Sequence, residues 1–328
     1  MAKYTNNTGI PLSVGVWLAT DTYQYPPDDG KKYISATGLL KSVRQNVLSK
    51  RIPKGGERQE DIVSKVASRF GTAIHDSIEM SWVNNYKNAM QSLGYPQAVV
   101  DRVRVNPTDP DEEGIIPVYM EQRFHKEVGD WIVSGQFDFV GDGRLEDFKS
   151  TGTFTWTKGN KDQDYIDQGS IYRWGRPDII TQDVLAIQFF FKDWQAFKAK
   201  DPKYPPSMLV EKTYKLRDIA DTDAWIKQKL FQIDMYENAP EADIPHCTDK
   251  ELWRDPPVWK YYKDPTKTEG RATKNFDNPQ EANLRFVQDG SVGIVIQRNS
   301  EPKACKYCPA VNLCSQAKHF IDTGELKL

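Results

Sequence analysis

The sequence predicts an α/β fold, and three features of its residue pattern carry that prediction. Before residue 94, apolar residues recur with the period of helices, whereas from Ile115 to Ser150 the period changes to 2, which is typical of strands. The tripeptide Gly141-Asp142-Gly143 marks a tight hairpin between two such strands. From there to residue 238, segments of helix and strand character follow one another, which indicates a sheet with helices packed on it.

Two helices are expected before the sheet. Residues 33–52 carry apolar side chains at helical spacing, with N-cap hydroxyls available at Ser35 and Thr37. Residues 61–93 form a longer amphipathic pattern. Its apolar stripe consists of Ile62, Val66, Phe70, Ile74, Ile78 and Trp82. We expect one continuous helix in each segment.

The elements after residue 115 follow from the same change of period. Three strands come first, and the Gly-Asp-Gly hairpin joins the second to the third. A helix, two further strands and a last helix come next. The predicted strands are 116–128, 131–141, 144–150, 184–194 and 208–216, and the predicted helices are 165–176 and 219–238.

The composition changes after Pro240. Charged residues, prolines and aromatics are interleaved there, with cysteines toward both ends of the segment. We therefore expect two regions, an α/β core at 1–240 and a four-cysteine C-terminal appendage at 241–328 that packs on the core.

The charge of the chain is nearly balanced, with 44 basic and 46 acidic side chains and a formal net charge of −2. Any nucleic acid or membrane must therefore be bound by a local patch of basic residues. The composition excludes collagen, low-complexity disorder and a coiled-coil rod. The chain has no run of about 18 apolar residues, and its start lacks the apolar core of a signal peptide. We expect a soluble protein of the cytoplasm.

The strands around the hairpin carry two carboxylates and a lysine. Side chains alternate between the faces of a strand, so Asp138 points away from its aromatic neighbours, and Asp147 shares a face with Lys149. Two carboxylates on adjacent strands beside an ammonium group suit a site for Mg²⁺ or Mn²⁺. The alternative is a solvated face on which Asp147 and Lys149 form an ordinary ion pair.

Two further features accompany these residues. His75 follows a Gly-Thr pair in the long helix, where the alternative is a structural histidine partnered by Glu79. Gln168 and Tyr172 lie four residues apart on one face of the helix after Lys149. An amide and a phenol there can bind a DNA backbone and position the lysine, or they can belong to the core.

The ordered set of these motifs resembles the PD-(D/E)XK nuclease superfamily. More narrowly it is similar to the RecB-like exonuclease branch, which includes the AddB-type and CRISPR-adaptation iron–sulfur nucleases. The resemblance covers roughly residues 33–175, with Phe137 in the place of the proline of the eponymous motif. The motif residues are His75, Asp138, Asp147-Phe148-Lys149 and Gln168-x3-Tyr172.

The resemblance implies a restriction-endonuclease-like core, with a central mixed β-sheet flanked by helices. It implies that Mg²⁺ or Mn²⁺ is held by His75, Asp138, Asp147 and the backbone carbonyl of Phe148. Lys149 would be the catalytic lysine, with Gln168 and Tyr172 as the auxiliary pair. The implied activity is metal-dependent hydrolysis of DNA phosphodiesters by an exonuclease acting on single-stranded DNA or DNA ends, in recombination, repair or phage DNA processing.

Two other hypotheses stay open. One is a non-catalytic DNA-binding or scaffold protein that retains the nuclease fold, and the other is a structural metal-binding protein unrelated to nucleases. The chain contains no P-loop motif, so a helicase partner would have to be a separate protein.

The four cysteines all lie in the last quarter of the chain. Three of them form a C-x2-C-x5-C cluster, a spacing that favours metal binding over disulfides in an intracellular protein. By resemblance, Cys247, Cys305, Cys308 and Cys314 bind a 4Fe–4S cluster, and zinc is the alternative. In known members the lone cysteine often precedes the core; Cys247 follows it, as in phage-encoded members. The remaining alternative is four unrelated buried thiols.

A DNA partner requires basic and aromatic residues near the hairpin. We expect Trp156, Trp174 and Tyr165 to stack on unpaired bases, with a place in the core as the alternative for Trp174. The candidate basic residues are Lys41, Arg44, Lys50, Arg51, Lys54, Lys158, Lys161, Arg173 and Arg176.

Overall fold

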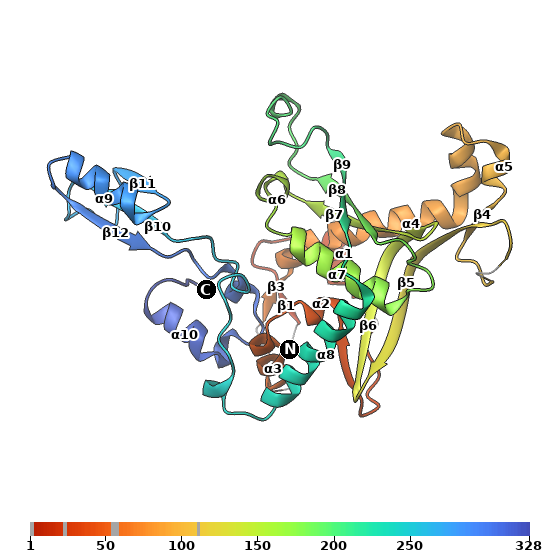
Figure 1. Ribbon diagram of the computed structural model, residues 1–328, viewed down its shortest axis with the longest axis horizontal. Coiled ribbons are helices and arrows are strands. Elements are labelled where there is room, and N and C mark those ends of the chain that lie inside the picture. Colours follow the sequence, from red (N-terminus) through yellow and green to blue (C-terminus); the bar gives the residue numbers. More distant parts are fainter. Residues whose placement is uncertain (1–2, 22–24, 54–58, 110–111) are drawn as a thin grey trace. The chain divides into compact units, whose positions relative to one another are not determined.

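A computed structural model describes residues 3–21, 25–53, 59–109 and 112–328. The chain divides into two compact units (Figure 1). The first unit consists of Met1–Leu40 and Gln59–Leu230, and the second consists of Lys41–Arg58 and Phe231–Leu328. Residues 41–53, which lie within the expected core at 1–240, therefore belong to the same unit as the C-terminal segment. None of the helices in the described ranges is long and apolar enough to cross a lipid bilayer.

The first unit is built on a curled, mixed seven-stranded sheet with the order β4-β5-β6-β7-β8-β9, in which β2 pairs with β6. The pairs β5·β6, β6·β7 and β8·β9 are antiparallel, whereas β2·β6, β4·β5 and β7·β8 are parallel. The strands are β2 (Lys32–Ser35), β4 (Val103–Val105), β5 (Ile116–Val128), β6 (Trp131–Gly141), β7 (Arg144–Thr151), β8 (Val184–Phe191) and β9 (Leu209–Lys215). The five predicted strands are confirmed, with ends shifted by a few residues.

The hairpin between β6 and β7 forms at the predicted tripeptide. Asp142 and Gly143 have φ values of 49° and 78°, and Gly141 pairs with Arg144. Two successive residues with positive φ are typical of the tight turns that match the twist of a hairpin.

Helices cover both faces of the sheet in the first unit (Figure 1). The long helix α4 packs Ile78 and Trp82 against Phe148 of β7, whereas α7 packs Gly169 close to Leu145 of the same strand. Phe148 and Leu145 point to opposite faces because side chains alternate along a strand. The helices are α1 (Leu12–Ala19), α2 (Ala36–Leu39), α4 (Val66–Ser92), α5 (Gln97–Val100), α6 (Thr153–Lys158), α7 (Asp162–Gly175) and α8 (Ile219–Tyr236), the last of which continues into the second unit.

The expected helix over 33–52 is wrong in its continuity. The segment forms β2, α2 and then α3 (Val43–Lys50). The Ser35 hydroxyl accepts a hydrogen bond from the backbone of Gly38, and the Ser42 hydroxyl accepts one from Gln45. Each serine is an N-cap in extended backbone, so the second cap separates the two helices. The predicted helix over 61–93 is confirmed as α4, preceded by a short 3₁₀ turn that Asp61 caps.

The second unit contains a small antiparallel sheet that the sequence pattern did not predict. Its strands, in the order β11-β10-β12, are β10 (Val258–Tyr262), β11 (Lys274–Phe276) and β12 (Ile294–Arg298). Helix α9 (Pro279–Gln288) packs on this sheet around Tyr261. With three to five residues each, the strands are too short to show a clear alternation. The remaining elements are α10 (Ser315–Asp322) and, in the first unit, the short pair β1 (Tyr4–Thr5) and β3 (Glu60–Asp61).

Candidate functional site

The predicted carboxylates meet where β6 and β7 separate. The two strands pair between the hairpin and the residues Phe139 on β6 and Glu146 on β7, which lie opposite each other. Beyond that point, the backbone N–H of Phe148 donates a 2.8 Å hydrogen bond to Oδ2 of Asp138, so a side chain replaces the next ladder contact. Asp138 and Asp147 are 7 % and 3 % exposed. Both carboxylates therefore lie buried where the strands separate, near enough for the charge of Asp147 to act on Asp138.

Lys149 lies beside these carboxylates. Its Nζ contacts Oδ2 of Asp147 and lies 5.8 Å from the ring centroid of Tyr165. Burial opposes the charged form of this lysine, but the negative charges of Asp147 and Asp138 outweigh burial and raise its pKa above the ordinary value. Lys149 is therefore an ammonium group at neutral pH.

His75 reaches the same place from helix α4. Its Nε2 lies 3.0 Å from the carbonyl oxygen of Phe148, and its Nδ1 lies 3.3 Å from Oε1 of Glu121 and 3.5 Å from Oδ1 of Asp138. Because both ring nitrogens face acceptors, the imidazole donates from both as the protonated form. Burial opposes this form, but the hydrogen bond to Glu121 and the charge of Asp138 outweigh burial and raise the pKa of His75 to about 9.

Glu121 is a site residue that the sequence reasoning missed. It lies on β5, and the pairing of Val128 with Trp131 places it directly opposite Asp138. Its φ is 48°, and the ladder is interrupted at this one position. Gln136 Nε2 donates a 2.8 Å hydrogen bond to Glu121 Oε2. Counting back from the Gly129-Asp130 turn would have identified this cross-strand partner from the sequence.

The site concentrates negative charge in a buried place. Potential ligand atoms of His75, Glu121 and Asp138 all lie within 4.8 Å of one another. Burial and the charge of Asp147 raise the pKa of Asp138 to about 7. Carboxylates crowded in this way are stabilised by a cation, and His75 and Lys149 supply positive charge in the protein alone. A divalent cation with oxygen and imidazole ligands fits the same donor set.

Gln168 and Tyr172 lie behind the carboxylates. Gln168 Nε2 donates a 2.7 Å hydrogen bond to the Tyr172 hydroxyl, and Tyr172 is 5 % exposed. A Cβ at Gly135 would lie 3.0 Å from the Tyr172 ring, so the ring packs tightly on the sheet. Burial, together with the charge of Asp147, raises the pKa of Tyr172 well above its ordinary value. Tyr172 is therefore a residue of the core, which was the alternative to contact with a DNA backbone.

The four cysteines gather in the second unit around one cavity of about 40 Å³. They are free thiols that pack with Leu252 and Phe320. Burial raises the pKa of Cys247, Cys305 and Cys308, and that of Cys305 reaches about 12. A metal that binds these thiols must therefore supply the free energy needed to deprotonate them. In the part of the chain that the structure describes, which includes all four, no three cysteine sulfurs lie within 4.8 Å of one another.

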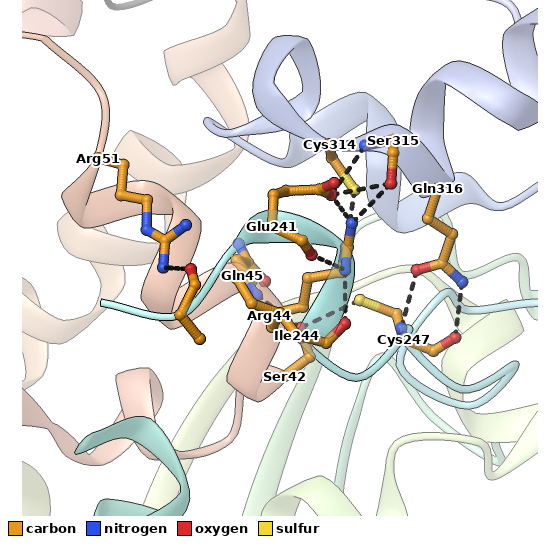
Figure 2. A network of polar contacts seen from close by, with 11 residues as sticks. Ser42, Arg44, Gln45, Arg51, Glu241, Ile244, Cys247, Cys314, Ser315 and Gln316 are labelled. Carbon is orange, nitrogen blue, oxygen red and sulfur yellow. Dashed lines mark hydrogen bonds and ion pairs between the residues drawn. The ribbon is translucent and has the colours of Figure 1, made fainter. Parts of the chain in front are cut away.

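Several residues expected to contact DNA are buried or form hydrogen bonds within the protein. Arg44 is 1 % exposed and lies beside Cys314 (Figure 2), and Trp174 is also 1 % exposed. Arg51 Nη2 donates to the backbone carbonyls of Tyr236, Glu237 and Ala239. The prediction that Arg44 and Trp174 bind DNA is therefore wrong, because burial makes them inaccessible. Lys54 lies outside the described residues.

The chain is only distantly similar to known proteins. No family model and no curated protein matches the sequence. The solved structure of SSO0001 is 13 % identical and covers 71 % of this chain and 89 % of its own, with a TM-score of 0.41. A phage-related exonuclease from Haemophilus somnus 129PT is 12 % identical and covers 62 % of this chain and 93 % of its own, with a TM-score of 0.28. Neither likeness is close enough to establish a shared fold.

Proposed function

We propose that the chain is a metal-dependent deoxyribonuclease with a restriction-endonuclease-like core. The observation that carries this proposal is the convergence of Asp138, Asp147, Lys149 and His75 on the backbone of Phe148, where two strands of a mixed sheet separate. An ordinary surface ion pair would not require two carboxylates that are each less than a tenth exposed.

The donor set supports a divalent-cation site. The proposed ligands are Asp138, Asp147, His75 and the Phe148 carbonyl, to which Glu121 adds a third carboxylate. His75, Glu121 and Asp138 have potential ligand atoms within 4.8 Å of one another, and Asp147 lies outside that group. Mg²⁺ or Mn²⁺ bound there would polarise a phosphodiester and lower the pKa of an attacking water. Burial of the carboxylates keeps bulk water from screening these charges.

Lys149 has the geometry of the catalytic group. Its ammonium group contacts Asp147, and 24 % of the side chain is exposed. In that position it orients a water by hydrogen bonding and offsets negative charge that develops on the phosphate. Gln168 and Tyr172, which are hydrogen-bonded to each other, are the proposed auxiliary pair.

We further propose single-stranded DNA or DNA ends as the substrate, processed by an exonuclease in recombination, repair or phage DNA processing. This part rests on the motif resemblance alone. Trp156 and Tyr165 remain the proposed base-stacking residues, and both have edge contacts with Phe189 close to Lys149.

For the cysteine site we propose a 4Fe–4S cluster. Four free thiols line one cavity, and the sequence has only one short C-x2-C knuckle where structural zinc sites more usually pair two, which supports this group over zinc. Such a cluster would join the loops that carry the four cysteines, and its role would be to stabilise the second unit.

The test is cleavage of end-labelled single- and double-stranded DNA by protein purified without oxygen, in Mg²⁺, Mn²⁺ or EDTA. Lys149→Ala should remove the metal-dependent cleavage. Lys126→Ala is the matched control, because Lys126 lies on the same sheet and packs its ammonium on the ring and carbonyl of Trp174. Metal-dependent cleavage that survives Lys149→Ala would overturn the assignment. DNA binding without cleavage would favour the non-catalytic hypothesis.

A further inference from the structure

Arg44 is a buried cation with an unusual set of partners in the second unit. It lies in the first turn of α3 and is 1 % exposed. Its Nε donates to Sγ of Cys314 at 3.1 Å, and its Nη1 donates to the carbonyl of Ile244 at 2.7 Å. Its Nη2 donates to Ser315 Oγ at 3.1 Å and pairs with the Glu241 carboxylate (Figure 2).

The contact with sulfur is the informative one. A buried guanidinium is costly unless its N–H groups meet good acceptors. Glu241 and the Ile244 carbonyl are good acceptors, but the sulfur of a neutral thiol is a weak one. The Nε–H donor is therefore best satisfied when Cys314 carries negative charge, as it does when it is bound to a metal.

A second residue of the same turn contacts another of the cysteines. The Ser42 hydroxyl lies 3.2 Å from Sγ of Cys247. The free thiol donates in this contact, whereas a metal-bound sulfur would accept from the hydroxyl, which rotates to suit. Gln316 fixes Cys247 further, since its Oε1 accepts from the Cys247 N–H at 2.8 Å and its Nε2 donates to the Cys247 carbonyl at 2.9 Å.

We infer that Ser42 and Arg44 are positioning residues that hydrogen-bond the metal-bound sulfurs of Cys247 and Cys314, with Arg44 offsetting the negative charge of the cysteine cofactor. The inference rests on the proposed cofactor but not on its identity, because four thiolates leave a net negative charge around either a zinc ion or a 4Fe–4S cluster. Through these contacts Ser42 and Arg44 control how firmly the metal is retained and how readily a cluster accepts an electron.

The experiment compares Arg44→Gln with Arg51→Gln. Arg51 lies at the other end of α3 and also makes its hydrogen bonds within the second unit, but it donates to backbone carbonyls rather than to sulfur. Both variants should lower thermal stability. Only Arg44→Gln should release metal to EDTA faster, by roughly tenfold, which is the usual effect of removing a ligand's hydrogen-bond partner.

The midpoint potential of a bound cluster is a second readout, which a purely structural role of Arg44 would not change. In protein carrying a cluster, titration with dithionite adds one electron, which a nearby positive charge stabilises. Arg44→Gln should therefore shift the midpoint potential to more negative values, and Arg44→Lys should shift it less because the charge is kept. Arg51→Gln should leave the potential unchanged. Arg44→Lys also serves if Arg44→Gln does not fold.

The outcomes separate this inference from the proposed cofactor. Equal metal release and equal potentials in Arg44→Gln and Arg51→Gln, in protein that holds metal, would overturn the role of Arg44 alone. A wild-type protein whose metal content is the same as that of Cys308→Ser would overturn both. Faster release in Ser42→Ala, smaller than in Arg44→Gln, would support the role of the second contact.

Discussion

Glu121 and Asp138 face each other across β5 and β6, with potential ligand atoms within 4.8 Å, and the ladder between the strands is interrupted at this pair. Opposed like charges destabilise a sheet. His75 lies between them and contacts both. In the protein alone, the imidazolium ion thus offsets negative charge that a metal ion would offset in the proposed nuclease. The carboxylates of the site thus carry the negative charge that a bound cation requires before any cation is present.

Asp138→Asn should abolish cleavage and stabilise the metal-free protein. The amide oxygen of the variant can still accept the hydrogen bond from the Phe148 N–H. The substitution removes a negative charge that burial and the charge of Asp147 disfavour. We expect activity to fall by roughly a hundredfold or more, and the melting temperature in EDTA at pH 8 to rise. Cleavage assays and thermal melts measure the two effects; near-normal activity would contradict the ligand assignment.

Glu121→Gln should raise the Mn²⁺ concentration needed for half-maximal cleavage by about tenfold, because one carboxylate of the proposed metal site is lost. Glu127→Gln is the control, since Glu127 lies on the same strand with 76 % of its side chain exposed. A metal titration of cleavage compares the variants. Equal midpoints for the two would remove Glu121 from the site.

The stability of the metal-free protein should fall as the pH rises from about 4 to about 9. The pKa of Asp138 is raised from 3.8 to about 7 and that of His75 from 6.5 to about 9, so across each interval the folded state binds more protons than the unfolded state. Each contribution is full below the ordinary pKa and is lost as the pH passes the raised one. Thermal melts in EDTA test this.

The control for the pH dependence is Asp138→Asn, which should show a smaller decline. Mn²⁺ should also reduce the decline, because a cation favours the deprotonated ligands. Identical pH profiles for wild type and Asp138→Asn would show that the decline originates elsewhere.

Tyr172→Ala should affect folding more than turnover. The ring is buried against Gly135, so its removal leaves a cavity that costs about 3–5 kcal/mol of unfolding free energy. Tyr172→Phe keeps the ring and loses the hydrogen bond from Gln168, at about 1 kcal/mol. Chemical denaturation measures both. A stable Tyr172→Ala protein with strongly reduced cleavage would instead indicate contact with DNA.

Cys308→Ser should lose bound metal and lower the melting temperature. Chelation of the wild-type protein should lower it to a similar value, because both treatments remove the same link between the cysteine loops. Metal analysis by mass spectrometry and thermal melts check this. An unchanged metal content in the variant would exclude Cys308 as a ligand.

The sequence by itself determined the strands at 116–128 and 131–141, the hairpin at Gly141-Asp142-Gly143, and the common face of Asp147 and Lys149. These features depend on the two-residue period of a strand and on turn conformation, both of which are local. The order of motifs along the chain also identified His75 as a partner of the carboxylates.

Only the tertiary structure decided what depends on partners distant in the chain. Arg44 is buried because Ile244 and Cys314, about 200 residues or more away, supply its acceptors. A charged residue has the same local pattern whether it meets solvent or a buried acceptor. The difference arises from desolvation and hydrogen bonding in the folded chain, which residue spacing does not encode.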